Sequence, residues 1–545
     1  MKNPILKREL TTTLRAPVTL ALAAVYLGVL AGLVWWMWPS QGVFSLAAQA
    51  SRSILLVFTV TQLLLVILYA PAFAATSITS EKEQNTYDLL FATVLRPWEI
   101  IGGKLMSSVV ALGMFVVLSA PFFTACFFLG ALSVREALVV YVVALASSVF
   151  FGLLGLCVSA VVSSSHTALV TTYLLILLLN AGPWVPHFLL QKQLWATGLV
   201  EMIRALSPVA AMASVIAPSF AATAAWKVYL IFTVAGVGVM TLFLLTTAYL
   251  TRGRPARSHG RAIDDPQELM RRKLRFPFYL IDPMRRKRNI PNWLNPIFAK
   301  EMRSKAFGGG IWIFRSAYLC FAVSILLMAA VAGNLVGETP DAIRVVALVF
   351  QLGLVVLVVP SLTAGAVTQE RERASLDLLR LSRIRARALL VGKLQVAAVF
   401  VMFLVIGSAP AWYVIHYLGT NTVTEILTCW GIILATMLVA ISTGLVCSAF
   451  APRTAVATAV AYGLVFAWSL VTLLPLLARD QLAGPVRDVL FAMNPFVSAI
   501  QVLTNGYFNQ VPDLWRTHLG WSVGISGVFF LAAYLRVRRL LALEK

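Results

Sequence analysis

Two short polar stretches carry matching charged residues in a chain that is 60% hydrophobic. The first stretch runs from Thr76 to Lys104, and the second runs from Gly365 to Lys393. Their carboxylates and amines can hydrogen-bond or ion-pair with the surface of another protein, which is chemistry suited to docking. The candidate residues are Glu81, Glu83, Asp88 and Lys104 in the first stretch, and Glu370, Glu372, Asp377 and Lys393 in the second.

The elements that must position these stretches are membrane spans. The chain has 545 residues, of which 12% are charged, and its mean hydropathy is +0.85. This composition is typical of a polytopic helical membrane protein. A span needs about 20 apolar residues, and runs of that length predict an all-α fold with about 12 spans. They lie at 18–38, 54–75, 105–131, 137–162, 167–187, 226–250, 311–336, 344–367, 394–418, 424–450, 455–477 and 517–535. We interpret the first span as a retained anchor and not as a signal peptide.

A shift of 289 residues places many features of the first half on the second, which predicts an internal duplication. The matched pairs include Glu81 with Glu370, Glu83 with Glu372, Asp88 with Asp377, Lys104 with Lys393, Gln62 with Gln351, Pro71 with Pro360 and Gly155 with Gly444. Each half has an even number of predicted spans, so both halves should point the same way, as two parallel six-helix repeats. The predicted domains are a first half at 1–250, a basic linker at 251–294 and a second half at 295–545.

The charged residues place both polar stretches outside the membrane. A charge at the centre of a membrane helix costs roughly 2.5–3.5 kcal/mol on insertion scales. Apolar residues in the first stretch recur at three- and four-residue steps, which predicts one or two short helices along the membrane surface. A simple connecting loop need not keep the same charged residues in both halves. Their retention therefore favours a docking role.

The basic residues predict the orientation of the chain. Most of the 44 Lys and Arg residues fall on one side if both termini and the linker are cytoplasmic, as the positive-inside rule requires. We therefore expect an integral protein of a bacterial inner membrane, with cytoplasmic N- and C-termini.

The basic linker is expected to be solvated and to touch anionic membrane lipid. A nucleic-acid site would need a folded basic face with aromatic platforms, so the net charge of +22 does not indicate a nucleic-acid partner. The five cysteines lie within or beside apolar spans, which is typical of packing residues. No cysteine or histidine spacing predicts a metal site.

The stretch SITSEKEQNTYDLLFATVLRPWEIIGGKL resembles the signature of type-2 ABC transporter permeases, the membrane halves of many ABC exporters. The resemblance implies that the stretch from Glu81 to Asp88, with Gly103 and Lys104, forms a coupling helix that contacts an ATPase. It also implies a membrane-parallel helix at NPILKREL and short re-entrant helices at LSPVAAMASV, near Pro208. It covers both halves, but IRARA replaces RPWEI in the second, so equal coupling by the two halves is not implied.

No G-x-x-x-x-G-K-[ST] phosphate loop occurs in the sequence, so we expect no nucleotide site, no bound cofactor and no enzyme activity in this chain. ATP and Mg²⁺ are expected on a partner ATPase with two nucleotide-binding domains, which makes this chain the permease of an ABC exporter. A twelve-span secondary transporter is the alternative, but it should place ionisable residues inside its spans, and these spans hold almost none. An intramembrane enzyme would need paired aspartates or an H-E-x-x-H motif within its spans, and neither occurs there.

Three amides are the polar candidates at membrane depth: Gln62, Gln351 and Asn180. Because a buried amide in hydrocarbon needs a partner, we expect Gln62 and Gln351 to face each other near the pseudo-two-fold axis, along a translocation pathway. Ordinary hydrogen bonding between helices would satisfy them equally well. The scarcity of charge predicts an amphipathic or hydrophobic substrate.

Overall fold

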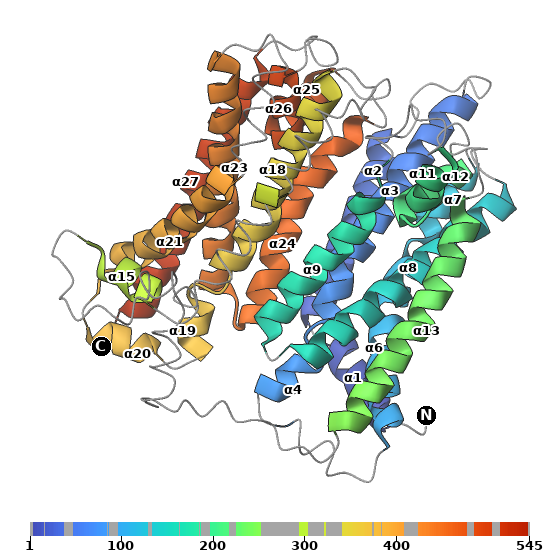
Figure 1. Ribbon diagram of the computed structural model, residues 1–545, viewed down its shortest axis with the longest axis horizontal. Coiled ribbons are helices and arrows are strands. Elements are labelled where there is room, and N and C mark those ends of the chain that lie inside the picture. Colours follow the sequence, from blue (N-terminus) through green and yellow to red (C-terminus); the bar gives the residue numbers. More distant parts are fainter. Residues whose placement is uncertain are drawn as a thin grey trace. The chain divides into compact units, whose positions relative to one another are not determined.

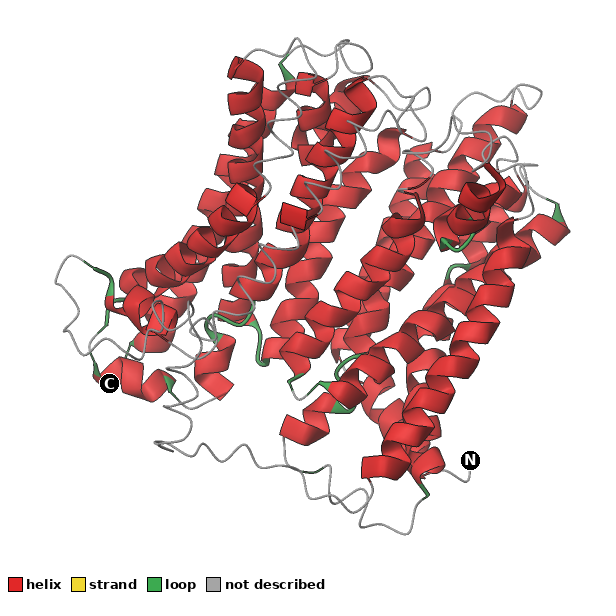
Figure 2. Ribbon diagram, in the orientation of Figure 1, coloured by secondary structure: helices red, strands yellow, loops and turns green. Residues whose placement is uncertain are grey.

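The computed structural model describes most of the chain as helices. The described residues are 4–15, 17–37, 47–83, 86, 96–128, 133–162, 164–184, 186, 197–216, 225–251, 294–303, 321–322, 340–372, 375–382, 384–407, 423–476, 484–503 and 513–542. Within these ranges every regular element is a helix and there is no strand (Figure 2). The predicted linker at 251–294 lies outside them, apart from its two end residues.

The chain forms two compact units. They are Met1–Ala256 with Phe466–Phe491, and Arg257–Val465 with Ala492–Lys545. The predicted division into two halves and a linker stays a prediction, as does the arrangement of the halves about an axis.

The first unit is a set of long helices joined by short ones (Figure 1). Its helices within Met1–Ala256 are α1 (Pro4–Arg15), α2 (Pro17–Met37), α3 (Ala47–Ala74), α4 (Thr79–Glu83), α6 (Pro97–Leu118), α7 (Ala120–Phe128), α8 (Val134–Val161), α9 (Ser165–Ala181), η1 (Gly182–Trp184), α11 (Thr197–Arg204), α12 (Pro208–Ile216) and α13 (Ala225–Thr251). Helix α8 packs against α3, α6, α9 and α13, and its buried residues include Phe150, Phe151 and Leu153. This packing makes α8 the central helix of the unit.

Local signals in the sequence explain where two of these helices begin. Ser133 caps α8: its hydroxyl accepts the Glu136 N–H, while the Glu136 carboxylate accepts the Ser133 N–H, which is the capping-box arrangement. Pro97 opens α6 at the first helical position, where a missing N–H costs nothing.

From residue 294 onward the chain continues with a similar sequence of helices. They are α15 (Pro296–Arg303), α18 (Pro340–Thr363), α19 (Thr368–Glu372), α20 (Leu376–Leu381), α21 (Ala386–Gly407), α23 (Val423–Phe450), α24 (Thr454–Leu470), η5 (Val471–Leu476), α25 (Gly484–Met493), α26 (Pro495–Leu503) and α27 (Leu514–Leu541). Helix α23 packs against α18, α26 and α27 and takes the central position that α8 has in the first unit.

The all-α, membrane-spanning fold class predicted from the sequence is confirmed. Nine helices of the described part are long and apolar enough to cross a membrane: α6, α8, α9, α13, α18, α21, α23, α24 and α27. The first two predicted spans fall on α2 and α3, where shorter apolar segments were found, Tyr26–Trp35 and Leu55–Ala70. The predicted span 311–336 lies outside the described residues except for Phe321 and Ala322. The number twelve stays a prediction.

Two short helices precede the last span of the first unit, at the site of the predicted re-entrant segment. Helices α11 and α12 meet at a bend of 103° between Arg204 and Pro208. The Ser207 hydroxyl lies in this bend and donates to the Asn180 carbonyl at 3.0 Å. The bend therefore packs on the end of α9.

Candidate functional site

The first polar stretch begins with a tight turn that is held from the side by α8. After α3 ends, the backbone N–H groups of Ile78 and Thr79 both donate to the Ser159 hydroxyl, at 3.1 and 3.0 Å. Gly155 lies one turn earlier on α8, and a Cβ there would meet the Ala74 Cβ at 3.0 Å. The glycine therefore allows α8 to approach this turn closely, and the turn starts α4.

The two adjacent charges of α4 bind the two sides of the α8–α9 connection. The Lys82 ammonium donates to the carbonyls of Ser159, Ala160 and Val162 at 3.1, 2.5 and 3.0 Å. The Glu83 carboxylate accepts the Ser165 N–H and hydroxyl at 2.8 and 2.7 Å. Because a helix C-terminus attracts cations and a helix N-terminus attracts anions, the dipeptide is matched in charge to the end of α8 and the start of α9. We call this arrangement the clamp.

Lys104 forms a second link, between the polar stretch and the N-terminal helix. Its side chain is only 3% exposed; its ammonium lies 2.9 Å from the Glu81 carboxylate and 3.6 Å from that of Glu9. It also donates to the Ser77 carbonyl at 2.8 Å. Burial raises the pKa of the Glu81 carboxyl, and the charge and hydrogen bond of Lys104 act against that rise. α1, α4 and the start of α6 are thus tied together at one end of the unit (Figure 1).

The second unit has the same contacts at positions 289 residues later. The Ser448 hydroxyl accepts the Val367 and Thr368 N–H groups at 2.8 and 3.1 Å. Arg371 donates to the Ala451 carbonyl at 3.1 Å. These contacts reproduce the turn and the part of the clamp that Lys82 forms in the first unit.

The part of the clamp that Glu83 forms in the first unit recurs as well. Glu372 accepts the Thr454 N–H and hydroxyl at 2.8 and 2.6 Å, as Glu83 does with Ser165. A deeper bond also recurs, since the Tyr173 hydroxyl donates to the Leu68 carbonyl at 2.8 Å and the Tyr462 hydroxyl to the Leu357 carbonyl at 2.7 Å.

The lysine link of the second unit differs in its details. Glu370 accepts from Lys300 on α15 at 2.8 Å, lies 3.4 Å from Lys393, and also accepts from the Ser375 hydroxyl. Burial would raise the pKa of the Glu370 carboxyl, but these partners outweigh it and lower the pKa to about 2. Lys393 in turn lies 2.6 Å from Glu301. The second unit therefore holds its central carboxylate with more cationic partners than the first.

The last acid of each predicted set has a different environment. Asp88 lies outside the described residues. Asp377 is 70% exposed, and its one ion-pair partner among the described residues is Arg380, three residues later on α20. Leu378 and Leu381 of the same helix are 67% and 75% exposed. Helix α20 therefore presents an apolar and acidic surface, whereas the acids of α4 and α19 are bonded to other parts of their own unit.

The three candidate amides lie in three long helices, α3, α18 and α9. Gln62 is fully buried and donates to the Ser119 hydroxyl at 2.9 Å, while its carbonyl oxygen has no partner among the described residues. Gln351 is 1% exposed, and neither of its amide atoms has a partner within the described ranges. Asn180 donates to the Ile176 carbonyl at 2.7 Å. The pathway role of these amides stays a prediction.

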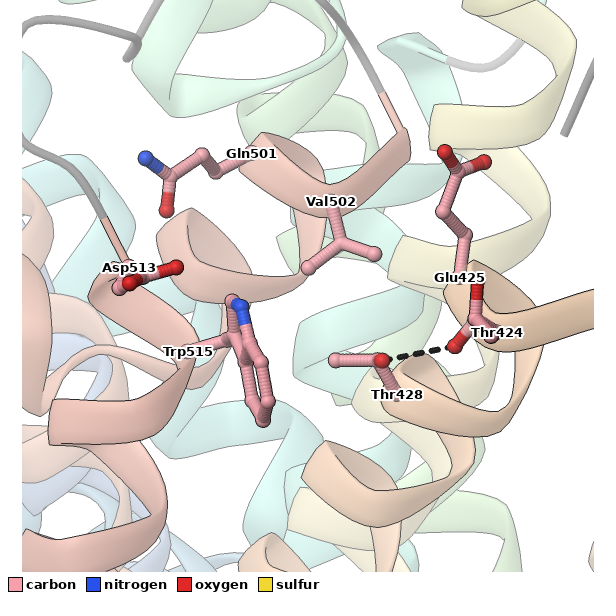
Figure 3. A pocket seen from close by; sticks show the side chains of 7 residues that line it. All are labelled: Thr424, Glu425, Thr428, Gln501, Val502, Asp513 and Trp515. Carbon is pink, nitrogen blue, oxygen red and sulfur yellow. Dashed lines mark hydrogen bonds between the residues drawn. The ribbon is translucent and has the colours of Figure 1, made fainter. Parts of the chain in front are cut away.

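A pocket that sequence reasoning missed lies at the opposite end of α23 from the clamp. It has a volume of about 460 Å³, and Figure 3 shows side chains from α23, α26 and α27 around it. Its lining residues are Thr424, Glu425, Thr428, Gln501, Val502, Asp513 and Trp515. Two carboxylates beside an indole favour a cationic group over an anionic one. No spacing in the sequence connects these three segments.

Sequence reasoning also missed the hydroxyl partners of the two clamps, although the repeat carried a signal for them. Ser159 and Ser448 are 289 residues apart, as are Ser165 and Thr454. Comparing the halves position by position would have selected these small hydroxyl residues together with the acids.

The fold and this arrangement define the class: a polytopic helical membrane protein with short charged helices, α4 and α19, that follow long helices. Residues 338–535 match the family model described as ABC-2 family transporter protein. This part of the chain, 198 of the 545 residues, is therefore similar to ABC-2 family transporter proteins. The match runs from just before α18 into α27, so the first polar stretch lies outside it. No curated protein matches the chain by sequence.

Proposed function

We propose that this chain is a permease that forms the translocation pathway of an ATP-driven exporter, and that its polar stretches couple the pathway to a separate ATPase. The observation that carries the proposal is the clamp, which occurs with the same contacts on α4 and on α19. In each unit a short helix outside the spans is bonded to both sides of the connection between two long helices. A force applied to the short helix therefore reaches two spans directly.

The recurrence of these contacts supports an internal duplication that fuses two permease halves in one chain. The same turn, clamp and tyrosine bond would not be expected in two unrelated sets of helices. One chain would then engage two nucleotide-binding domains at the cytoplasmic face, where ATP and Mg²⁺ are bound by the partner. The same proposal has both termini in the cytoplasm and the chain in a bacterial inner membrane.

We infer that the contact surface is α20 and not the acids. Glu81, Glu83, Glu370 and Glu372 are bonded within their own units, so their role in coupling is to hold the short helices in place. The exposed side chains of α20, which are Asp377, Leu378 and Leu381, are free to contact the ATPase. An exposed apolar pair beside a charge is suited to a protein interface.

The scarcity of charge within the spans supports an amphipathic or hydrophobic substrate, with Gln62, Gln351 and Asn180 as candidate pathway residues. Each is polar at the depth of a span, and the carbonyl oxygen of Gln62 has no protein partner among the described residues. Such an atom is available to water or to substrate.

Co-purification of the tagged permease with its ATPase tests the proposal. The double variant Leu378→Ser and Leu381→Ser removes exposed apolar surface without opening a cavity, and should abolish most ATPase binding. Leu199→Ser on α11, where Leu199 is 62% exposed, is the matched control and should retain it. Equal ATPase recovery with both proteins would exclude α20 as the contact surface, and transport driven by an ion gradient without ATP would favour the secondary-transporter alternative.

A further inference from the structure

Two guanidinium groups contact neighbouring residues, Ala451 and Phe450, at the C-terminal end of α23, and each has a buried donor without a partner among the described residues. Arg371 donates a hydrogen bond from Nη1 to the Ala451 carbonyl. Its Nη2 is buried without a partner among the described residues. The Arg536 guanidinium lies 5.6 Å from the centre of the Phe450 ring. Its Nε is likewise buried without a partner in the described part of the chain. Buried donors of this kind are costly unless a ligand or water satisfies them.

The acids around these arginines are already paired. Glu372 is bonded to Thr454, Asp377 to Arg380, and Glu370 to Lys300 and Lys393. Within the described ranges no carboxylate lies within ion-pair distance of the remaining arginines of this end, which are Arg371, Arg453, Arg536, Arg538 and Arg539. The region therefore carries an uncompensated positive charge.

Apart from the bond of Arg371 to Ala451, the cluster is not part of the arrangement that the two units share. In the first unit Lys82 replaces Arg371, and its ammonium is satisfied by three carbonyls. Thr247, Tyr249 and Leu250 stand 289 residues before Arg536, Arg538 and Arg539. The clamp uses one nitrogen of Arg371 and none of the other arginines, and a separate ligand accounts better for the remaining donors.

An apolar surface leads from the cluster along α27. Val528, Leu531 and Leu535 are 66%, 57% and 48% exposed and recur at helical spacing on one face. Phe450, under the Arg536 guanidinium, is 56% exposed. Because α27 is one of the helices able to span the membrane, this face is suited to an acyl chain, and the arginines lie at its end.

We propose that Arg371 and Arg536, assisted by Arg539, bind the phosphate of an anionic phospholipid whose chains lie on the exposed face of α27. Guanidinium groups bind phosphate oxygens with paired hydrogen bonds, and basic residues at the cytoplasmic surface favour anionic over zwitterionic lipid. An acidic protein surface would match the charge but not the adjoining apolar face. The site would tie one lipid to α19, α23 and α27, beside the clamp of the second unit.

Binding of lipid to the delipidated full chain in detergent, followed by native mass spectrometry, tests the proposal. Phosphatidylglycerol should bind more tightly than phosphatidylcholine, and the double variant Arg536→Gln and Arg539→Gln should lose about fivefold in affinity per arginine, or about 25-fold in total. These residues lie outside the clamp, so the variant should fold. Arg516→Gln is the matched control at the other end of α27 and should keep the selectivity.

Equal binding of the two lipids to the unaltered protein, or equal selectivity in the double variant and in Arg516→Gln, would overturn the proposal. Soluble glycerol phosphate provides a third arm. If it displaced phosphatidylglycerol at equal concentration, the site would be one for free phosphate and the lipid assignment would be wrong.

Discussion

Replacing Glu372 by alanine should weaken the clamp of the second unit by a measurable amount. The substitution removes two hydrogen bonds, of 2.8 and 2.6 Å, from the first residue of α24. Loss of a capping side chain costs about 0.5–2 kcal/mol, and the favourable charge at a helix N-terminus adds about 0.3–1 kcal/mol. Because Glu372 is exposed, solvent screens the charge contribution. We therefore expect the free energy of unfolding to fall by about 1–2 kcal/mol.

Thermal unfolding of the detergent-solubilised protein measures this loss. A change of 1 kcal/mol shifts Tm by about 2–4 °C in a unit of this size, so Glu372→Ala should lower Tm by about 2–8 °C. Asp377→Ala is the control, because Asp377 is 70% exposed and has one partner, three residues away on its own helix. Its Tm should change by no more than about 2 °C, since an exposed ion pair three residues apart on one helix contributes about 0.2–0.5 kcal/mol.

A double-mutant cycle with Thr454→Val isolates the contact itself. If the clamp exists, the losses from Glu372→Ala and Thr454→Val should not add, and the coupling energy should be about 0.5 kcal/mol or more. Additive losses, or a Tm for Glu372→Ala equal to that of Asp377→Ala, would refute the clamp.

Four further predictions concern coupling, charge, the pathway and assembly. Glu81→Ala should let ATP hydrolysis continue while transport falls in proteoliposomes, whereas Glu370→Ala should uncouple less, because the surroundings differ in the second half; unimpaired transport by a correctly inserted Glu81→Ala protein would contradict this. Because the folded-state pKa of Glu370 is lowered to about 2, its stabilising contribution is present above the unfolded pKa near 4.5 and is lost as the pH falls toward 2, so the Tm difference between the protein and Glu370→Gln should shrink over that range; a constant difference would be inconsistent with the ion pairs. Cysteines at positions 62 and 351, replacing Gln62 and Gln351, should cross-link with a short reagent if they face a shared pathway, and mass measurement of the complex should give one permease chain for two ATPase domains.

The fold class and the recurrence of the polar stretches could be predicted from the sequence because both depend on local composition and on register. Apolar runs fix the helices, and the shift that places Glu81 on Glu370 also predicts that their environments are related. The structure bears this relation out at the level of contacts, since Lys104 pairs with Glu81 as Lys393 does with Glu370.

The partners toward which the acidic side chains point could not be predicted from the sequence. A charged residue in a polar stretch is equally compatible with solvent, a partner protein or a neighbouring helix end. The partner of Glu83 is the start of α9, which lies 82 residues away in the sequence. Its position in space depends on the fold. The pocket beside Trp515 was missed for the same reason, because its walls come from three helices whose proximity no local pattern encodes.

The clamp also has a consequence for recognising related joints in other chains. Its basic residue precedes its acidic residue in both units, as Lys82–Glu83 and as Arg371–Glu372. The reversed order would direct like charges at both helix ends, whereas exchange of lysine for arginine keeps a donor for the carbonyls. In both units the acid is followed 82 positions later by a hydroxyl residue that starts a helix. A basic–acidic dipeptide with a serine or threonine at that interval is therefore a searchable signature that depends on polarity and spacing, and it should survive where overall sequence identity has been lost.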